Sequence, residues 1–235
     1  MDLEKEIWTK KDFEEFEKYL ATFSKGEEKG EWEKRIVNTS LPCIAVPSTK
    51  IDELAKKIYK GNFISFIDVC YFSNFSLTRI VGILISKIKD FDVQKKYLYD
   101  FCHKVDNWAS IDCIKILPKD KDAQYLSFAK KLLKDDYIFA RRLGAIILLK
   151  IINEKTIDEI LNTILSLTRE SEYYVNMALS WLVAECFVKF RDKTLPLFES
   201  KKLNSFVQNK GISKCRDSFR VGKADKEYLF SLRIK

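Results

Sequence analysis

The 235-residue sequence is poor in the residues that interrupt regular structure. It contains 7 glycines and 4 prolines, whereas an all-β sandwich or barrel would need a turn about every ten residues. Hydrophobic residues make up 46% of the chain. That is enough for one sizeable core, or for a row of helices that bury their surface between neighbours. The composition therefore predicts an all-α fold and argues against disorder.

Residues that hold metals or form disulfide frameworks are also scarce. There is one histidine, His103, and the six cysteines include no Cys-x-x-Cys pair. This pattern predicts neither a zinc site nor a regular disulfide framework, and we expect reduced thiols. The sequence also lacks a glycine-rich phosphate loop and a nucleotide-binding fingerprint. We therefore expect no cofactor and no metal.

Long apolar runs are absent as well. The longest aliphatic run, LGAIILLKII, is shorter than the roughly 20 residues that a membrane-spanning helix requires. The first segment, MDLEKEIWTKKDFEEFEKYL, is charged from its second residue and does not resemble a signal peptide. We therefore expect a cytoplasmic monomer that does not contact a membrane.

The net charge of +8 is concentrated near the C-terminus. Residues 184–235 hold 13 Lys/Arg against 6 Asp/Glu, whereas residues 1–183 hold 29 against 28. A localised cationic surface is typical of proteins that bind a phosphate backbone, although it can also serve solubility alone. The candidate phosphate-binding cations lie within NKGISKCRDSFRVGK and are Lys210, Lys214, Arg216, Arg220 and Lys223.

Apolar residues recur at helical spacing along most of the chain, which predicts about ten helices joined by short turns. Thr156 is predicted to cap one helix, with Glu159 at its third position. Two segments break the pattern. Residues 24–31 are expected to form a solvated loop, and residues 209–225 contain Gly211 and Gly222.

The stretch VDNWASIDCIKI places a carboxylate beside an indole. Asn107 is predicted to cap a helix that ends at Pro118, which puts Trp108 and Asp112 one turn apart on one face. Asp112 lies beyond the first turn, so it is too late to be a cap. Because its neighbours are apolar, an unpaired carboxylate there would be costly to desolvate. It therefore needs a partner or a functional role.

Two further residues recur at a repeat-like spacing. Arg142 follows Trp108 by 34 residues, and Trp181 follows Arg142 by 39, within the period expected of helical repeats. A stack of helix pairs would place corresponding helices along one concave wall. Taken singly, Trp108 is explained equally well as a core aromatic. For Trp181 core packing is the leading simple interpretation, and for Arg142 it is solvation beside Arg141.

Three segments together resemble the DNA alkylation repair glycosylases built from HEAT-like repeats, the AlkD family. They are DNWASID at 106–112, RLGAIILLK from Arg142, and YYVNMALSWLVAECFVKF at 173–190. The resemblance runs over most of the chain, from about LPCIAVPSTKIDELAKKI onward. It implies a right-handed superhelical stack of HEAT-like antiparallel helix pairs, an α-solenoid with a concave basic groove. We expect one domain over 1–235, with an N-terminal helix and loop at 1–31 and basic helices at 205–235.

The resemblance also implies a site and an activity. In that family a Trp-x-x-x-Asp pair, an arginine from the next repeat and a tryptophan from the one after it form the active-site cleft. Asp112 would then be catalytic, Trp108 and Trp181 would contact the lesion, and Arg142 would bind a phosphate. The implied activity is hydrolysis of the N-glycosidic bond of positively charged N3- or N7-alkylated purines in double-stranded DNA.

Two alternatives stay open from the sequence. Family members are expected to carry a Tyr-Glu-Glu-like element, but VCYFSNFSLTR has no acid after Tyr71. That departure motivates a non-catalytic relative that recognises bent or branched DNA by shape. The other alternative is a helical-repeat scaffold that binds another protein on its concave face, since fold alone does not define function.

Overall fold

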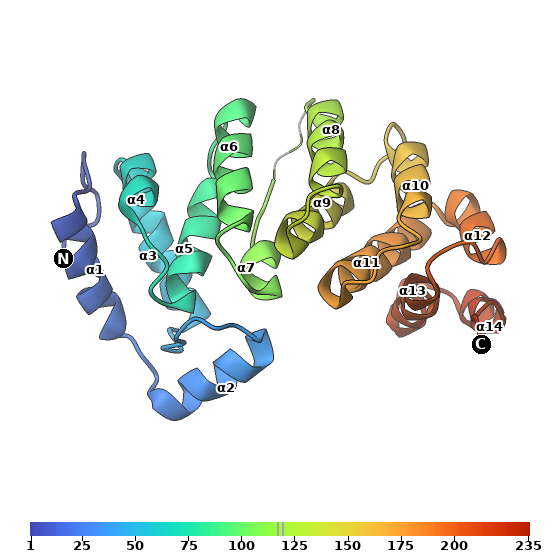
Figure 1. The fold of residues 1–235 in the computed structure, drawn as a ribbon, viewed down its shortest axis with the longest axis horizontal. Coiled ribbons are helices and arrows are strands. Elements are labelled where there is room, and N and C mark those ends of the chain that lie inside the picture. Colours follow the sequence, from blue (N-terminus) through green and yellow to red (C-terminus); the bar gives the residue numbers. More distant parts are fainter. Residues whose placement is uncertain (117, 119) are drawn as a thin grey trace. The chain divides into compact units, whose positions relative to one another are not determined.

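The computed structural model describes residues 1–116, 118 and 120–235, and this part of the chain is all-α. It contains fourteen helices and no strand there (Figure 1), which confirms the all-α prediction. The count exceeds the ten or so expected from the sequence. The chain divides into two compact units, Met1–Lys115 (unit 1) and Ile116–Lys235 (unit 2).

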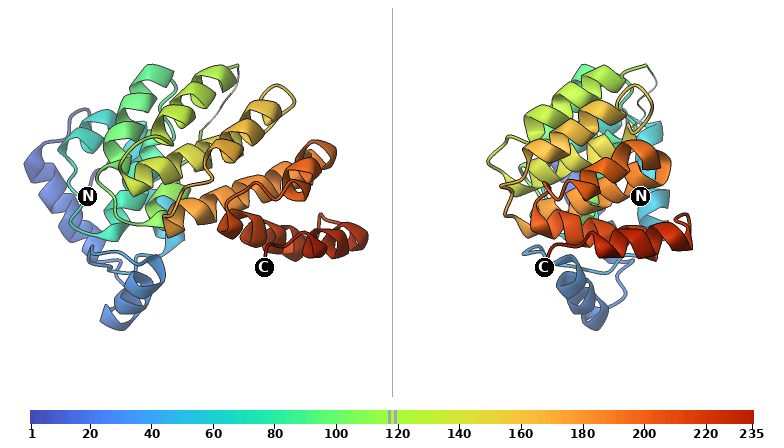
Figure 2. Two further views of the ribbon diagram at one scale, coloured as in Figure 1. Left: turned by 45° about the vertical axis from the view of Figure 1, so that its right-hand side comes forward. Right: turned by 90° about the vertical axis from the view of Figure 1, so that its right-hand side faces the viewer.

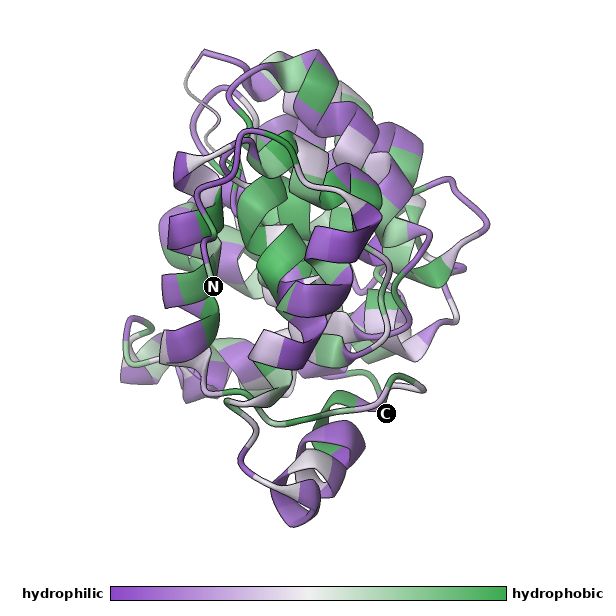
Figure 3. Cartoon of the chain, turned by 90° about the vertical axis from the view of Figure 1, so that its left-hand side faces the viewer, coloured by the Kyte–Doolittle hydropathy of each residue, from purple (hydrophilic) through white to green (hydrophobic). Residues whose placement is uncertain are grey.

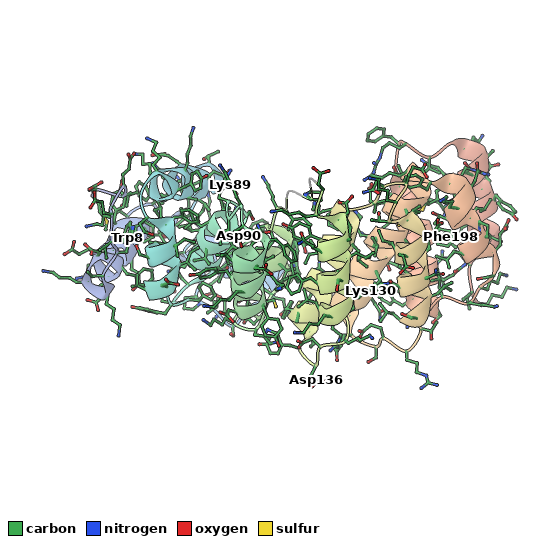
Figure 4. The ribbon with its side chains drawn as sticks, turned by 90° about the horizontal axis from the view of Figure 1, so that it is seen from above. Trp8, Lys89, Asp90, Lys130, Asp136 and Phe198 are labelled. Carbon is green, nitrogen blue, oxygen red and sulfur yellow. The ribbon has the colours of Figure 1, made fainter. Side chains whose placement is uncertain are left out.

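Unit 1 contains seven helices within its described residues. They are α1 (Lys10–Ala21), α2 (Glu27–Val37), α3 (Ser48–Lys60), α4 (Phe63–Val69), α5 (Phe75–Ile85), α6 (Phe91–Cys102) and α7 (Trp108–Asp112). Helix α5 packs against α3, α4, α6 and α7, while α4 also contacts α1. The core includes Trp8, labelled in Figure 4, whose ring lies edge-on to Phe66 with a centroid distance of 4.9 Å. Such offset aromatic pairs add to the stabilisation from burial.

Unit 2 holds the remaining helices. They are α8 (Asp122–Leu132), α9 (Ile138–Lys150), α10 (Ile157–Ser166), α11 (Tyr173–Lys189), α12 (Arg191–Glu199), α13 (Ser205–Asp217) and α14 (Lys223–Ser231). Helix α11 lies between α9 and α13, while α8 packs on α9 and α10 on α11. In Figure 2, α13 and α14 lie side by side, in agreement with their contacts. The stack of HEAT-like helix pairs, the superhelix and the single domain stay predictions.

Helix α2 occupies much of the segment predicted to be a loop at 24–31. Gly26, at φ 91°, turns the chain immediately before the helix, a conformation that glycine adopts readily. Glu27 and Glu28 then lie in the first turn, where negative charge is favourable. The helix is mostly hydrophilic, as Figure 3 shows at the bottom of the view. Because α2 has no wide apolar stripe, the spacing of its hydrophobic residues does not predict a helix.

Helix α13 runs through Gly211, where the sequence suggested a break. A Cβ at Gly211 would lie 2.7 Å from Cγ1 of Val183, so the glycine allows α13 to approach α11 closely. Gly222 does mark a boundary, because it is the N-cap residue of α14. The prediction of basic helices at 205–235 therefore agrees with α13 and α14, but the irregular segment is short.

Two predicted helix ends also differ in detail. The helix opened by Asn107 ends at Asp112, well before Pro118, and Cys113 is its C-cap residue. Thr156 is the N-cap residue of α10 as predicted, but its side chain makes no capping bond. Its hydroxyl donates instead to the carbonyl of Ile151. Across the described residues, no helix is long and apolar enough to cross a membrane.

Candidate functional site

Helix α7 presents Trp108 and Asp112 on the side that reaches solvent. Both are half-buried, whereas Ser110 and Ile111 on the opposite side are fully buried. The predicted cap is confirmed: Oδ1 of Asn107 accepts from the backbone N–H of Ser110 at 2.9 Å. The five-residue helix is thus defined by its cap, and it orients a carboxylate and an indole to the same side.

The half-buried carboxylate of Asp106 anchors the segment before α7. Its Oδ2 accepts from the backbone N–H and the hydroxyl of Ser40, both at 2.6 Å. Its Oδ1 accepts from the hydroxyl of Thr39 at 2.5 Å and from Nδ2 of Asn107 at 3.2 Å. Burial opposes ionisation of Asp106, but these hydrogen bonds outweigh it and hold its pKa below the usual value. Asp106 therefore ties the start of α7 to the chain segment after α2.

Two more contacts fix α7 on α5. The hydroxyls of Ser110 and Thr78, both fully buried, are 2.6 Å apart and share a hydrogen bond. After the helix, the backbone N–H of Lys115 donates to Oγ of Ser86 at 2.8 Å. This second bond draws the chain toward the end of α5, which explains why α7 ends so early. These hydrogen bonds, which orient α7, lie within unit 1.

Arg79 lies close to this helix, although it is not among the site residues predicted from the sequence. Burial raises the pKa of the Cys113 thiol to about 12; the Arg79 guanidinium acts against that rise and the Asp112 carboxylate adds to it. Both charges are therefore within electrostatic range of the residue that follows α7. Nη2 of Arg79 also donates to Oγ of Ser48 at 2.9 Å. The sequence could have indicated Arg79, because it is the single charged residue in the apolar segment that forms α5.

Arg79 also lines a basic hollow in unit 1, the α2–α3 hollow, of about 610 Å³. Its lining consists of Lys25, Glu28, Lys29, Trp32, Glu33, Arg35, Ala45, Val46, Pro47, Ser48 and Arg79. Four of these residues are cationic and two are acidic. Burial raises the pKa of Glu33, and Trp32 keeps 59% of its surface exposed. Cations around an exposed indole form a surface that suits a phosphate-bearing ligand.

In unit 2, Arg142 is buried, with 5% of its surface exposed. Its Nη1 donates to the backbone carbonyl of Tyr174 on α11 at 2.6 Å. Arg142 is therefore not the solvated arginine of the simpler interpretation, because it lies on the side of α9 that faces α11. Its neighbour Arg141 is half-buried, and Nε lies 2.9 Å from a carboxylate oxygen of Glu170. The role of Arg142 in binding a phosphate stays a prediction.

Trp181 belongs to a narrow stripe of α11 that reaches solvent. The half-buried residues of that stripe are Tyr174, Met177, Trp181, Glu185 and Val188. The ammonium of Lys150 on α9 lies 5.9 Å from the centre of the Trp181 ring. Lys150 follows Arg142 by eight residues, which is a rise of roughly 12 Å along α9. Trp181 is therefore half-buried, and its contact with a lesion stays a prediction.

The five predicted C-terminal cations do not share one face. Arg220 is paired with Glu185 of α11 through both of its terminal nitrogens. Arg216 instead lies over the ring of Phe230 on α14, 4.4 Å from its centre. Lys223 is exposed and 3.9 Å from Glu227. The remaining two, Lys210 and Lys214, lie one turn apart on α13.

The four central site residues therefore divide between the units. Unit 1 presents the indole and carboxylate of Trp108 and Asp112, and unit 2 holds Arg142 and Trp181 on adjacent helices. Their convergence on one groove stays a prediction. Among the described residues, no group of three or more His, Cys, Asp or Glu side chains could hold a metal ion.

The chain is thus an all-helical protein in its described residues, with an indole–carboxylate pair anchored at the surface of one helix as its candidate site. The model of one family, the DNA alkylation repair enzymes, matches residues 9–195. The chain therefore belongs to the DNA alkylation repair enzyme family. The match includes all four central site residues and ends within α12, before α13 and α14. No curated protein and no solved structure matches the chain.

Proposed function

We propose that the protein is a DNA glycosylase that hydrolyses the N-glycosidic bond of positively charged N3- or N7-alkylated purines in double-stranded DNA. The observation that carries this proposal is the presentation of Trp108 and Asp112 on the solvent-reaching side of α7, within a chain of the DNA alkylation repair family. The helix is anchored on both sides of these residues, so the pair is oriented before a ligand binds.

The chemistry explains why one carboxylate suffices. A purine alkylated at N3 or N7 is cationic and leaves without protonation by an enzyme acid. As the bond to the base lengthens, positive charge develops on the deoxyribose. The Asp112 carboxylate stabilises that charge more than it stabilises the ground state, and it can orient the attacking water. Asp112 is therefore the proposed catalytic residue.

The aromatic and cationic residues supply recognition. The indoles of Trp108 and Trp181 contact the cationic nucleotide, with cation–π attraction of about 1 to 2 kcal/mol each when desolvated. Arg142 binds a phosphate beside the lesion, and its bond to Tyr174 pre-orients the guanidinium. The concave groove of the proposed α-solenoid would bring these side chains to one duplex.

The remaining cations bind the DNA backbone without reading its sequence. In unit 2 these are the C-terminal cations Lys210, Lys214, Arg216, Arg220 and Lys223. In unit 1 the α2–α3 hollow adds four cations beside Trp32. Phosphate contacts of this kind suit a repair enzyme that must search every sequence. The protein would act as a cytoplasmic monomer.

The direct test is base release from alkylated duplex DNA by Asp112→Asn. We expect the variant to retain DNA binding and to lose about 100-fold in the rate of base release, because a charge that meets the developing sugar cation is removed. Asp52→Asn is the matched control, since Asp52 is an exposed aspartate of α3 in the same unit. Release at the wild-type rate by a DNA-bound Asp112→Asn variant would contradict the catalytic role.

A second candidate is a non-catalytic member of the family that recognises DNA by shape. It is favoured by the environment of Tyr71, whose hydroxyl donates to Glu17 of α1 at 2.5 Å. That hydrogen bond raises the pKa of Tyr71. The nearby acid thus comes from α1, whereas Tyr71 lies in the connection between α4 and α5, so it does not restore the expected Tyr-Glu-Glu-like element. Steeply salt-dependent DNA binding without base release from any alkylated substrate would select this candidate.

A further inference from the structure

Helix α14 carries a group of cations around an exposed phenylalanine. Lys223, Lys226 and Phe230 are spaced at three and four residues, which places them on one side of the helix. Arg233 follows just after the helix ends. Together with Arg216 of α13, these residues form what we call the α14 face.

The ring of Phe230 contacts two guanidinium groups but remains accessible. The guanidinium carbon of Arg216 lies 4.4 Å from the ring centre, and that of Arg233 lies 5.8 Å from it. Phe230 nevertheless keeps 50% of its surface exposed. An exposed phenylalanine is costly in water, so a ring positioned by two guanidinium groups and left open suits a planar ligand.

A hollow of about 400 Å³ is lined in part by Arg216, the residue that lies over this ring. It is lined by Ser213, Arg216, Asp217, Lys223, Lys226 and Glu227. The lining of the hollow thus includes three cations, one hydroxyl and two carboxylates. With Arg233, the α14 face carries four positive charges. The balance is positive, and the hollow is wide enough for a phosphate group.

The charge of the surrounding segment has the same sign. Residues 205–235 contain eight Lys/Arg and three Asp/Glu. One of these acids, Asp225, is held by Arg191 of α12 at 2.7 Å and is neutralised there. The segment also lies outside the residues that match the family model, which end at 195. The α14 face is therefore a feature of this chain that the family match does not account for.

We propose that the α14 face binds single-stranded DNA, with a backbone phosphate in the hollow and an unpaired base stacked against Phe230. A single strand fits better than a duplex, because a base offers its flat face to a protein ring only when it is unpaired or unstacked. Arg216 and Lys223 are also proposed above as contacts to the duplex backbone, whereas Lys226 and Phe230 belong to the single-strand contact alone. It lies wholly within unit 2 and involves neither Asp112 nor base release.

The test measures binding of the full chain to a fluorescent oligothymidylate of about 20 nucleotides by anisotropy. Phe230→Ala is expected to weaken this binding about tenfold, the usual effect of removing one stacking ring. Lys226→Ala should reduce the slope of log K against log salt concentration by about 0.7, the value for one phosphate contact on a single strand. Binding of an unalkylated duplex should change much less in Phe230→Ala.

Tyr228→Ala is the matched control. Tyr228 lies on the same helix, is 45% exposed and points away from the α14 face toward Glu199, to which its hydroxyl donates at 2.7 Å. Thermal unfolding of each variant shows whether it is folded. Wild-type affinity of a folded Phe230→Ala variant, or equal weakening by Tyr228→Ala, would overturn the proposal.

Base release from alkylated duplex is measured with the same proteins. If wild type releases no base but binds the single strand through Phe230, the glycosylase proposal fails and this one stands. If base release is intact and the single strand is not bound, the reverse holds.

Discussion

Asp106→Asn should loosen α7 without changing any residue that faces the proposed ligand. The carboxylate of Asp106 accepts four hydrogen bonds, from Ser40 twice and from Thr39 and Asn107 once each. Asparagine keeps one oxygen and replaces the other with an N–H₂ group, which faces donors. About two of the four bonds are therefore lost, together with the charge that strengthens them.

The expected cost follows from these contacts. A hydrogen bond to a charged group contributes about 1.5 to 3 kcal/mol, and the exposure of Ser40 reduces that value. We expect Asp106→Asn to lower the free energy of unfolding by about 2 kcal/mol in total, which corresponds to a fall in Tm of roughly 4 to 8 °C. Base release should fall as well, because Asp112 loses its fixed position.

The dependence on pH provides a separate check. The pKa of Asp106 is lower in the folded protein than in the unfolded chain, so its stabilisation is fully present above the unfolded value of about 4. It is lost as the pH falls through the folded value. The difference in Tm between wild type and Asp106→Asn should therefore shrink below about pH 4.

Differential scanning calorimetry at neutral and acid pH measures both effects. Asp92→Asn is the control, because the Asp92 side chain is 80% exposed and its loss should cost less than about 0.5 kcal/mol. An Asp106→Asn variant with the Tm of wild type at neutral pH would refute the assigned role of Asp106. A difference in Tm that persists unchanged at acid pH would refute the part played by its charge.

Further predictions concern the packing of each unit. Gly144→Ala should lower stability by about 1 to 3 kcal/mol in thermal unfolding, because the new Cβ would lie 2.8 Å from the backbone oxygen of Ala129; an unchanged Tm would show that α8 can move aside. Ser110→Ala should lower the free energy of unfolding by about 1 kcal/mol. Thr78→Val should lower it less in the Ser110→Ala variant than in wild type, because both changes remove the same hydrogen bond, and a double-mutant cycle measures the difference. The Cys186 thiol, whose pKa burial raises to about 12, should resist a thiol reagent at pH 8 in the folded protein; rapid native labelling would contradict its burial.

Local signals in the sequence predicted those features that depend on neighbouring residues. Asn107 caps α7 because an asparagine side chain reaches the N–H three residues on, whatever the tertiary structure. The one-turn spacing of Trp108 and Asp112 likewise follows from helix geometry. The same reasoning placed Thr156 at a helix start, but it missed the competing carbonyl of Ile151 that its hydroxyl contacts instead.

Features that depend on distant residues could not be predicted in this way. The early end of α7 depends on Ser86, which binds the N–H of Lys115 and lies 29 residues before it. Gly211 breaks a helix pattern in the sequence, yet it lies inside α13 because Val183 of α11 leaves no room for a Cβ. The burial of Arg142 depends on the position of α11, which no local pattern encodes.

The position of α7 makes the proposed site divisible by experiment. The hydrogen bonds described above for this helix come from residues 39–115, and unit 1 ends at Lys115. Variants of Asp106 and Ser110 therefore perturb only the indole and carboxylate of α7, while Arg142 variants perturb the packing of α9 on α11. If both sets reduce base release, and a double-mutant cycle between Asp106 and Arg142 shows coupling in base release but none in stability, the two units contribute to one reaction. Normal base release by folded Arg142 variants, with reduced release by the Asp106 and Ser110 variants, would instead confine the chemistry to unit 1.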